Sequence, residues 1–240
     1  MSGAVELASK PYRVPLKNRL ARRGLRPPFR WLFRILGKVE IHGLENIPKE
    51  GAYLVAPNHI SIFDGPFVAV FWPDILEIAG AAVVWEKPGQ SILARLWGGI
   101  KVHRGQYDRA LIDTTLAVLQ SGYPLLIAPE GGRSHVPGLR RANPGVAYLM
   151  DKAMVPVVPV GVVGGTEDFV KNALRGKRQR IAMYIGKPIT LEPVVEKGAV
   201  RRDKRQKNAD AVMAHSAALL PVGYRGVYAD HEVLTGQTNK

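Results

Sequence analysis

Residues 53–64, YLVAPNHISIFD, decide the fold because an apolar run there ends in a turn that carries polar side chains. The run before Asn58 is typical of a buried strand, and the apolar residues after Asp64 indicate a helix that continues to Phe71. His59 then lies in the turn that leaves the strand, and Asp64 lies in the first turn of the helix. The carboxylate can therefore bond one ring nitrogen of the imidazole, fix its tautomer and leave the other nitrogen to take a proton. The alternative is that the two residues only cap a strand-to-helix turn.

A second segment, residues 124–134 with the sequence PLLIAPEGGRS, also ends an apolar run in polar residues and glycines. Gly131 and Gly132 permit backbone conformations that other residues avoid, and they let a ligand approach closely. Arg133 offers a planar fork of donors that suits phosphate. The segment therefore predicts an anion pocket, with a Gly-Gly turn and a solvated arginine as the alternative.

Two shorter segments complete the expected fold. Residues 98–104, GGIKVHR, predict a short strand that ends in Arg104, and residues 155–161, VPVVPVG, are a β-branched run broken by prolines. Strands are expected near residues 53–56, 100–103, 125–128, 155–163 and 181–185, alternating with helices such as residues 108–121 and 143–154. This alternation predicts a three-layer α/β fold, with a mostly parallel central sheet flanked by helices. His59, Arg104 and Glu130 each follow a predicted strand, so they should meet at one edge of the sheet.

In this order, the four segments resemble the PlsC-like 1-acylglycerol-3-phosphate O-acyltransferase family, also called lysophosphatidic acid acyltransferases, over residues 39–189. The matching positions are His59 and Asp64 for the His-x4-Asp signature, Arg104 for the strand-borne arginine, residues 129–134 for the Pro-Glu-Gly-x-Arg-Ser block and residues 155–160 for the Val-Pro-x-x-Pro-Val strand. The chain departs from the family pattern in three places. Gly132 stands where threonine is frequent, Ala128 stands where an aromatic residue is frequent, and residues 84–87, VWEK, fit the expected lysine-containing stretch only loosely.

The resemblance implies transfer of a fatty acyl group from acyl-CoA or acyl carrier protein to the free hydroxyl of 1-acylglycerol-3-phosphate, a lysophospholipid, giving phosphatidic acid in phospholipid biosynthesis. His59 would be the catalytic base and Asp64 its orienting acid. The resemblance places the substrate-binding residues at Arg104, Glu130, Gly131, Gly132, Arg133 and Ser134. The acyl donor is a substrate, and no cofactor is expected. Another lysolipid, such as a glycolipid or an ornithine lipid, is the alternative acceptor.

The composition indicates an acidic partner. The 240 residues carry a formal net charge of +14, and the pI is near 10.1. An anionic membrane surface and nucleic acid both attract such a chain. The sequence has no cysteine, which excludes disulfides and an enzyme thiol, and its histidines lack the spacing of zinc ligands, so no metal is expected.

Residues 10–38 mix basic side chains with aromatic and aliphatic ones, a pattern typical of a helix that lies in the headgroup region of a membrane. Pro27 and Pro28 are expected to start this helix, which would run to Gly37 with an aromatic face that begins at Phe29. No apolar stretch reaches the roughly 18 residues that span a bilayer, so we expect a peripheral protein on the cytoplasmic face of the cell membrane. A basic helix that packs back on its own domain is the alternative.

Three parts of the chain are expected. They are a membrane-surface segment (residues 1–38), an acyltransferase domain (residues 39–222) and a mobile tail (residues 223–240). Within the domain, residues 197–207 are expected to be a solvated linker before a helix near residues 209–220. Because most of the aromatic face begins at Phe29, loss of residues 1–26 should have little effect on membrane attachment. No signal peptide is expected in the first twenty residues.

Two other classes of protein fit less well. A serine hydrolase would need a G-x-S-x-G sequence around Ser134, and the chain lacks it. A basic module that binds a membrane or nucleic acid without catalysis fits the charge. However, no nucleic-acid partner is expected, because no nucleic-acid-binding motif is recognisable.

Overall fold

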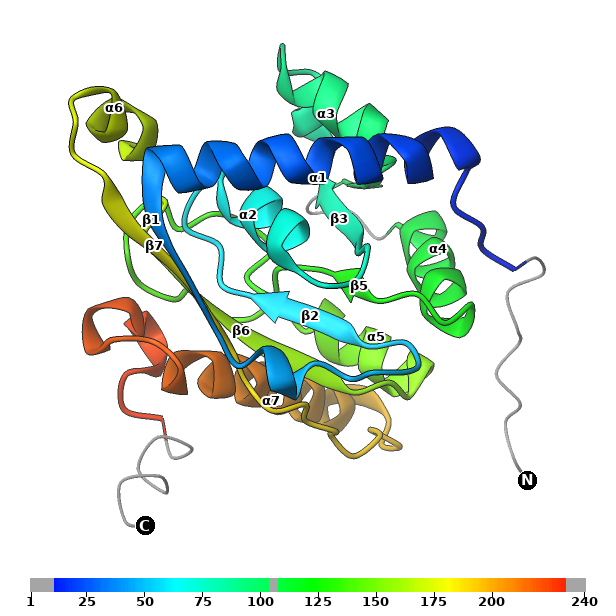
Figure 1. Ribbon diagram of the computed structural model, residues 1–240. Coiled ribbons are helices and arrows are strands. Elements are labelled where there is room, and N and C mark those ends of the chain that lie inside the picture. Colours follow the sequence, from blue (N-terminus) through cyan, green and yellow to red (C-terminus); the bar gives the residue numbers. More distant parts are fainter. Residues whose placement is uncertain (1–10, 104–107, 232–240) are drawn as a thin grey trace.

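The computed structural model describes residues 11–103 and 108–231. Within them, seven strands form one sheet between two layers of helices (Figure 1). The strands are β1 (Gly37–His42), β2 (Leu54–Pro57), β3 (Glu77–Ala81), β4 (Ile100–Val102), β5 (Leu125–Leu126), β6 (Val157–Val163) and β7 (Gln179–Ile185). The α-helices are α1 (Leu16–Leu36), α2 (Asp64–Phe71), α3 (Gln90–Trp97), α4 (Arg109–Gln120), α5 (Gly145–Ala153), α6 (Phe169–Leu174) and α7 (Gly198–Ala218). Short 3₁₀ helices are η1 (Leu44–Asn46), η2 (Ala82–Trp85), η3 (Val222–Tyr224) and η4 (Gly226–Tyr228).

The sheet has the order β1-β7-β6-β2-β5-β3-β4 and is mostly parallel. β6, β2, β5, β3 and β4 run in one direction, while β7 is antiparallel to β6 and β1 is parallel to β7. The predicted three-layer α/β fold is therefore confirmed. It also has strands β1 and β3 and helices α3 and α6, which the sequence patterns did not predict.

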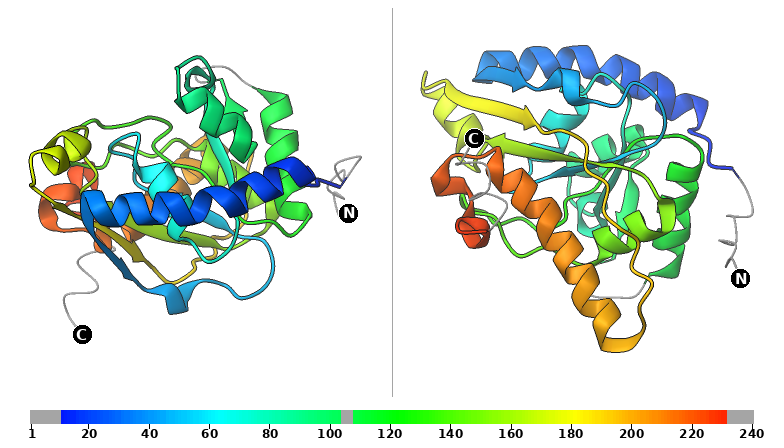
Figure 2. Two further views of the ribbon diagram at one scale, coloured as in Figure 1. Left: turned by 45° about the horizontal axis from the view of Figure 1, so that its top comes forward. Right: turned by 90° about the horizontal axis from the view of Figure 1, so that it is seen from below.

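Helices cover both faces of the sheet, so the central strands are buried on both sides. Figure 2 shows α1 and α2 over one face and α7 over the other. In β2, Val55 packs under α1 and α2, whereas Leu54 and Ala56 belong to the apolar cluster on the opposite face. All seven residues of β6 are buried. A strand buried on both faces needs no polar positions, which explains the unbroken apolar runs in the sequence.

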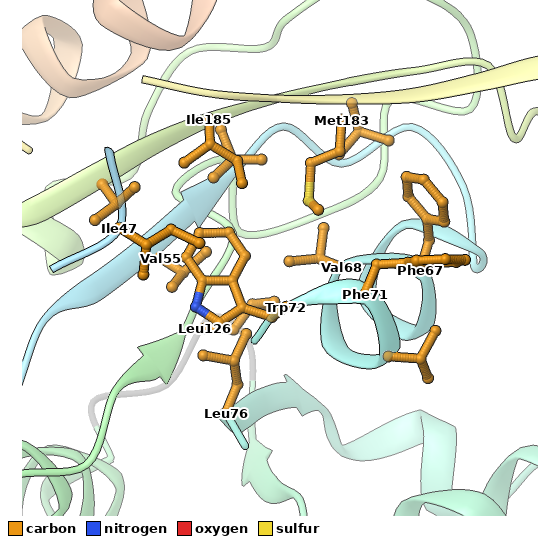
Figure 3. Packing of buried hydrophobic residues seen from close by; sticks show 14 of the residues in the cluster. Ile47, Val55, Phe67, Val68, Phe71, Trp72, Leu76, Leu126, Met183 and Ile185 are labelled. Atoms are coloured by element: carbon orange, nitrogen blue, oxygen red, sulfur yellow. The ribbon is translucent and has the colours of Figure 1, made fainter. Parts of the chain in front are cut away.

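The core on the α2 side is built around Trp72, the residue that ends α2. Its indole is fully buried and lies among Val55, Leu126 and other members of this cluster (Figure 3). The indole Nε1 donates a hydrogen bond of 2.9 Å to the hydroxyl of Tyr53, which in turn donates to Asp74 over 2.8 Å. The buried ring thus fixes the end of α2 against the start of β2 without leaving its polar atom unpaired.

Helix α1 begins earlier than predicted. It starts at Leu16, so Pro27 and Pro28 lie inside the helix and do not begin it. Proline within a helix removes a hydrogen bond and costs about 3 kcal/mol, so contacts along one face of the helix must outweigh the sequence signal. Those contacts come from Asn18, Arg22 and Phe33, which are buried against the domain. Neither this helix nor any other in the described ranges is long and apolar enough to cross a membrane.

A buried ion pair ties α1 to the sheet. Arg22 and Glu77 are 1% and 0% exposed, and the guanidinium bonds both carboxylate oxygens, with Nη2 at 2.7 Å from Oε2. Tyr12 donates its hydroxyl to the same carboxylate over 2.7 Å, and Arg22 Nε donates to the carbonyl of Trp97 over 2.6 Å. Loss of residues 1–26 would leave Glu77 buried without its cation, so we expect this deletion to destabilise the domain, whatever its effect on membrane attachment.

The C-terminal part also differs from expectation. Residues 197–207 are not a linker, because α7 already begins at Gly198. Residues 223–231 pack against the domain through η3 and η4, with Tyr228 buried. The part of the expected mobile tail that the structure describes is therefore ordered, while residues 232–240 lie outside the described ranges.

We expect Arg22→Met to lower the free energy of unfolding by about 3–5 kcal/mol, because the carboxylate of Glu77 stays buried without its cation. Urea unfolding measures this loss. The double variant Arg22→Met/Glu77→Gln should lose less than Arg22→Met alone. Arg109→Met is the matched control, since its ion pair with Asp113 is 78% and 63% exposed, and such pairs contribute about 0–1 kcal/mol. Equal losses at Arg22 and Arg109 would contradict the assigned role of the buried pair.

Candidate active site

His59 and Asp64 meet in the turn between β2 and α2. Asp64 is the first residue of α2, and its Oδ2 lies 3.1 Å from His59 Nδ1. The same oxygen accepts the backbone N–H groups of Ile60 and Ser61 over 2.6 and 2.7 Å. Asp64 is 1% exposed and His59 is 22% exposed. The carboxylate is therefore held in one orientation, and the imidazole beside it remains open to solvent.

This geometry suits a general base. Because Nδ1 faces Asp64, Nε2 is the nitrogen that can accept a proton from a ligand. A carboxylate in contact with the ring also stabilises the imidazolium that forms. The second oxygen of Asp64, Oδ1, is buried and has no hydrogen-bond partner within the described part of the chain. Orphaned buried acceptors are rare in folded proteins, and this one lies on the proposed orienting acid.

Two polar side chains pin this turn to the end of β6. The side chain of Asn58 donates to the carbonyl of Val162 over 3.0 Å and accepts its N–H over 2.6 Å. The side chain of Asn58 therefore continues the hydrogen bonding between β2 and β6 beyond the last residue of β2. The hydroxyl of Ser61 donates to the carbonyl of Gly165, beyond the end of β6. The turn that carries His59 is thus held at two points, one on each side of His59.

Glu130 holds the turn from the side of β5. Its Oε1 accepts the N–H of His59 over 2.8 Å, and its Oε2 accepts the N–H of Arg140 over 2.9 Å. Burial of the side chain raises the pKa of Glu130 to about 7, although both backbone N–H groups act in the opposite direction. Glu130 lies beside the proposed base, as predicted, and both of its oxygens bond backbone N–H groups.

The glycine-rich loop after Glu130 lies against the same turn. The N–H of Ser134 donates to the carbonyl of His59 over 2.9 Å. Gly131 has a φ of +66°, a conformation that favours glycine, and its N–H already donates to the carbonyl of Ala128 over 3.1 Å. Gly132 is buried. The loop therefore brings all four predicted positions, 131–134, to the edge of the sheet that carries the imidazole.

Arg133 has an acidic neighbour that sequence reasoning missed. Its Nη1 lies 3.7 Å from Oε1 of Glu167, in the loop after β6, and His135 Nδ1 lies 2.7 Å from the same oxygen. The hydrogen bond from His135 and the charges of Arg133 and Lys87 lower the pKa of Glu167. No motif marks Glu167 in the sequence, and only its place after a buried strand could have indicated it.

Arg104, the remaining predicted site residue, lies outside the described residues. Elsewhere in ranges 11–103 and 108–231, no group of three or more His, Cys, Asp or Glu side chains is arranged to hold a metal ion. The site that the structure shows therefore consists of His59, Asp64, Glu130 and the loop that carries Arg133.

Residues 38–163 match the protein-family model described as Acyltransferase. Uncharacterized proteins of Mycobacterium bovis and Mycobacterium tuberculosis are 32% identical over 152 residues, which is 60% of this chain and 42% of each relative. The match thus spans less than half the length of these relatives. The crystal structure of the 1-acyl-sn-glycerophosphate (LPA) acyltransferase PlsC from Thermotoga maritima has a similar fold, with a TM-score of 0.60 at 20% identity, over 81% of this chain and 79% of that chain.

The raised pKa of Glu130 predicts a pH-dependent stability. Since the pKa rises from 4.5 to about 7 on folding, the folded protein binds this proton more tightly than the unfolded chain. The contribution of Glu130 is therefore fully present below pH 4.5 and is lost as the pH rises through 7. Its size is about 3 kcal/mol. Glu130→Gln should remove this difference from urea unfolding curves at pH 5 and pH 8.

Carbon NMR of the Glu130 carboxyl group gives a direct check, with a midpoint expected near pH 7. The variant Glu167→Gln is the control and should leave the midpoint of Glu130 unchanged. Glu167 is exposed, and its own pKa is lowered. A midpoint near 4.5 in the folded protein would show that burial does not perturb the Glu130 side chain.

Proposed function

The chain belongs to the acyltransferase family, and from this premise we propose that it transfers a fatty acyl group from a thioester donor to the free hydroxyl of 1-acylglycerol-3-phosphate. The donor is acyl-CoA or acyl carrier protein, and the product is phosphatidic acid. The observation that carries the proposal is the contact between His59 and Asp64 at the sheet edge, beside the loop that holds Arg133. The resemblance drawn from the sequence motifs is confirmed at the level of the family and the fold.

The proposed reaction needs one proton shuttle. Nε2 of His59 takes the proton of the acceptor hydroxyl while the hydroxyl oxygen attacks the carbonyl carbon of the thioester. The tetrahedral intermediate then collapses, the carbon–sulfur bond breaks, and the leaving thiolate takes the proton from the imidazolium. Asp64 stabilises the imidazolium during both steps, because its Oδ2 stays at Nδ1.

Arg133 supplies a cation for the phosphate of the acceptor. Its ion pair with Glu167 involves a carboxylate that is 56% exposed, and exposed pairs contribute only about 0–1 kcal/mol. A phosphate with a bidentate geometry can therefore displace Glu167 from the guanidinium. Arg104 stays a proposed second phosphate ligand on the strength of the motif alone.

Glu167 also favours a second candidate. A carboxylate beside Arg133 suits an acceptor that carries an amine as well as an acidic group, as a lysolipid derived from ornithine does. Assays with phosphorylated and unphosphorylated acceptors, followed by mass spectrometry of the extracted lipids, separate the two candidates.

The exposed face of α1 supports a place at the membrane surface, and we propose that the protein docks there on the cytoplasmic side. Trp31 is 67% exposed, whereas Phe33 is buried and Phe29 packs against the core, so Trp31 is the aromatic residue that can insert. The face opposite the buried one combines exposed apolar and basic side chains, namely Leu16, Lys17, Leu20, Trp31, Arg34 and Ile35. α3 lies beside α1 (Figure 1) and adds exposed Ile92, Leu93 and Leu96. An apolar face bordered by basic residues fits an anionic lipid surface.

We expect His59→Ala to lower kcat by about 10²–10⁴-fold, because a positioned general base contributes that much. Asp64→Asn should also lose most of the activity, since an amide can favour the wrong tautomer of the imidazole. Acyl transfer is measured with radiolabelled donor, and circular dichroism checks that each variant is folded. His42→Ala is the control, because His42 is exposed on β1. A folded Asp64→Asn protein with wild-type kcat would rule out the dyad.

The membrane proposal predicts that Leu20→Glu and Trp31→Glu weaken sedimentation with anionic liposomes while acyl transfer in detergent micelles continues. Val200→Glu is the matched control, since Val200 is exposed on α7, which covers the opposite face of the sheet (Figure 2). Binding of the wild-type protein should weaken in high salt without vanishing, because salt screens charge over about 8 Å at physiological ionic strength but leaves apolar insertion intact. Unchanged sedimentation of both α1 variants would refute the docking face.

A further inference from the structure

Residues 139–142 form a bridge segment that is held from two sides. On one side, the N–H of Arg140 donates to Oε2 of Glu130 over 2.9 Å. On the other side, the N–H of Leu139 donates to the carbonyl of Tyr224 over 3.2 Å. The N–H of Arg140 thus bonds Glu130 of the candidate site, and the N–H of the residue before it, Leu139, bonds the C-terminal part of the chain.

Tyr228 makes the tightest of these contacts. Its side chain is buried, and its hydroxyl accepts the N–H of Ala142 over 2.7 Å while donating to Oδ1 of Asp210 over 2.6 Å. Gln206 completes the arrangement, because its Nε2 donates to the carbonyl of Ala142 over 2.9 Å and to Asp210 over 3.0 Å. Both backbone groups of Ala142 are therefore fixed by η4 and α7.

The backbone of the C-terminal part approaches the bridge segment closely at Gly226. A Cβ atom there would lie 2.2 Å from the carbonyl oxygen of Leu139, and the φ of Gly226 is +53°. Only glycine satisfies both conditions. The neighbouring N–H of Val227 donates to the same carbonyl over 3.2 Å.

The same part of the chain holds a second loop of the site. The hydroxyl of Tyr224 accepts the N–H of Gly164 over 3.2 Å, at the end of β6. The next residue, Gly165, accepts the hydroxyl of Ser61 from the turn that carries His59. Residues 221–228, called here the C-terminal clamp, thus contact both loops that border this turn.

We propose that the C-terminal clamp positions the catalytic base, and that Tyr228 is a positioning residue that acts through the bridge segment and Glu130. The path runs from the hydroxyl of Tyr228 to Ala142, along the bridge segment to the N–H of Arg140, and through Glu130 to the N–H of His59. The clamp lies outside residues 38–163, the part that matches the family. The proposal rests on the proposed function for its catalytic readout only.

The mechanism predicts a specific change when Tyr228 loses its hydroxyl. The bridge segment is then free to shift, and the N–H of Arg140 no longer stays at Oε2. Because this N–H lowers the pKa of Glu130 against the effect of burial, the pKa rises further above its present value. A protonated Glu130 loses an acceptor oxygen, so the turn that holds His59 loses part of its support.

Tyr228→Phe tests the proposal, because the phenyl ring keeps the packing and only the two hydrogen bonds are lost. We expect kcat to fall about fivefold, the size of one lost hydrogen bond, with the KM for the donor unchanged. The acid limb of the pH profile of kcat should move to higher pH, and the NMR midpoint of Glu130 should rise with it. Tyr184→Phe is the matched control, since Tyr184 packs against the same apolar cluster but its hydroxyl bonds Arg180.

A double-mutant cycle with Glu130→Gln shows whether the effect passes through this carboxylate. Tyr228→Phe should cost kcat in the wild-type background and have no further effect in the Glu130→Gln background. An equal loss in both backgrounds, or an unchanged NMR midpoint of Glu130 in Tyr228→Phe, would overturn the proposal. If Tyr228→Phe does not fold, Asp210→Asn weakens the same hydroxyl contact and gives the same tests. The NMR midpoint needs no acyl transfer, so its outcome is independent of whether the proposed function holds.

Discussion

The arrangement of the site depends on two buried carboxylates that accept backbone N–H groups. Asp64 takes two N–H groups of the turn after β2 and orients the imidazole, and Glu130 takes the N–H of His59 itself. The turn has no repeating pattern of hydrogen bonds, so its shape is set by these side chains together with the N–H of Ser134, which donates to the carbonyl of His59. Because each carboxylate belongs to a different element, α2 or the loop after β5, the position of His59 depends on how those elements pack on the sheet.

Much of the fold follows from local sequence patterns. The elements that these patterns did not predict, or predicted with the wrong bounds, have identifiable causes. The apolar runs around Val55 and Val160 are unbroken because both faces of their strands are covered by helices. Such runs are easily recognised as strands. β1 and β3 were missed because their residues are mixed in polarity and only partly buried. The start of α1 was misplaced because Pro27 is a strong local signal, whereas the contacts that keep the helix intact, such as Arg22 with Glu77, are distant in sequence.

Some contacts of the candidate site could likewise be predicted from the local sequence, and others could not. The spacing of His59 and Asp64 is local, so the contact between them could be predicted from the turn that it requires. The partners of Glu130 could not be predicted, because a backbone N–H group such as that of Arg140 leaves no trace in residue type. The acid beside Arg133 was missed for a similar reason, since Glu167 reaches it from another loop.

The ion pair between Arg22 and Glu77 has a mechanical consequence. Arg22 lies in the first half of α1, and further contacts at Asn18 and Phe33 hold the helix on either side of it. A helix attached along its length cannot pivot like a tethered anchor. Any surface on which the outer face of α1 rests would then set the tilt and the height of the whole sheet above that surface. The distance from that surface to the imidazole of His59 would then be fixed. It would be determined by the packing of α1 on the domain and not by a flexible connection.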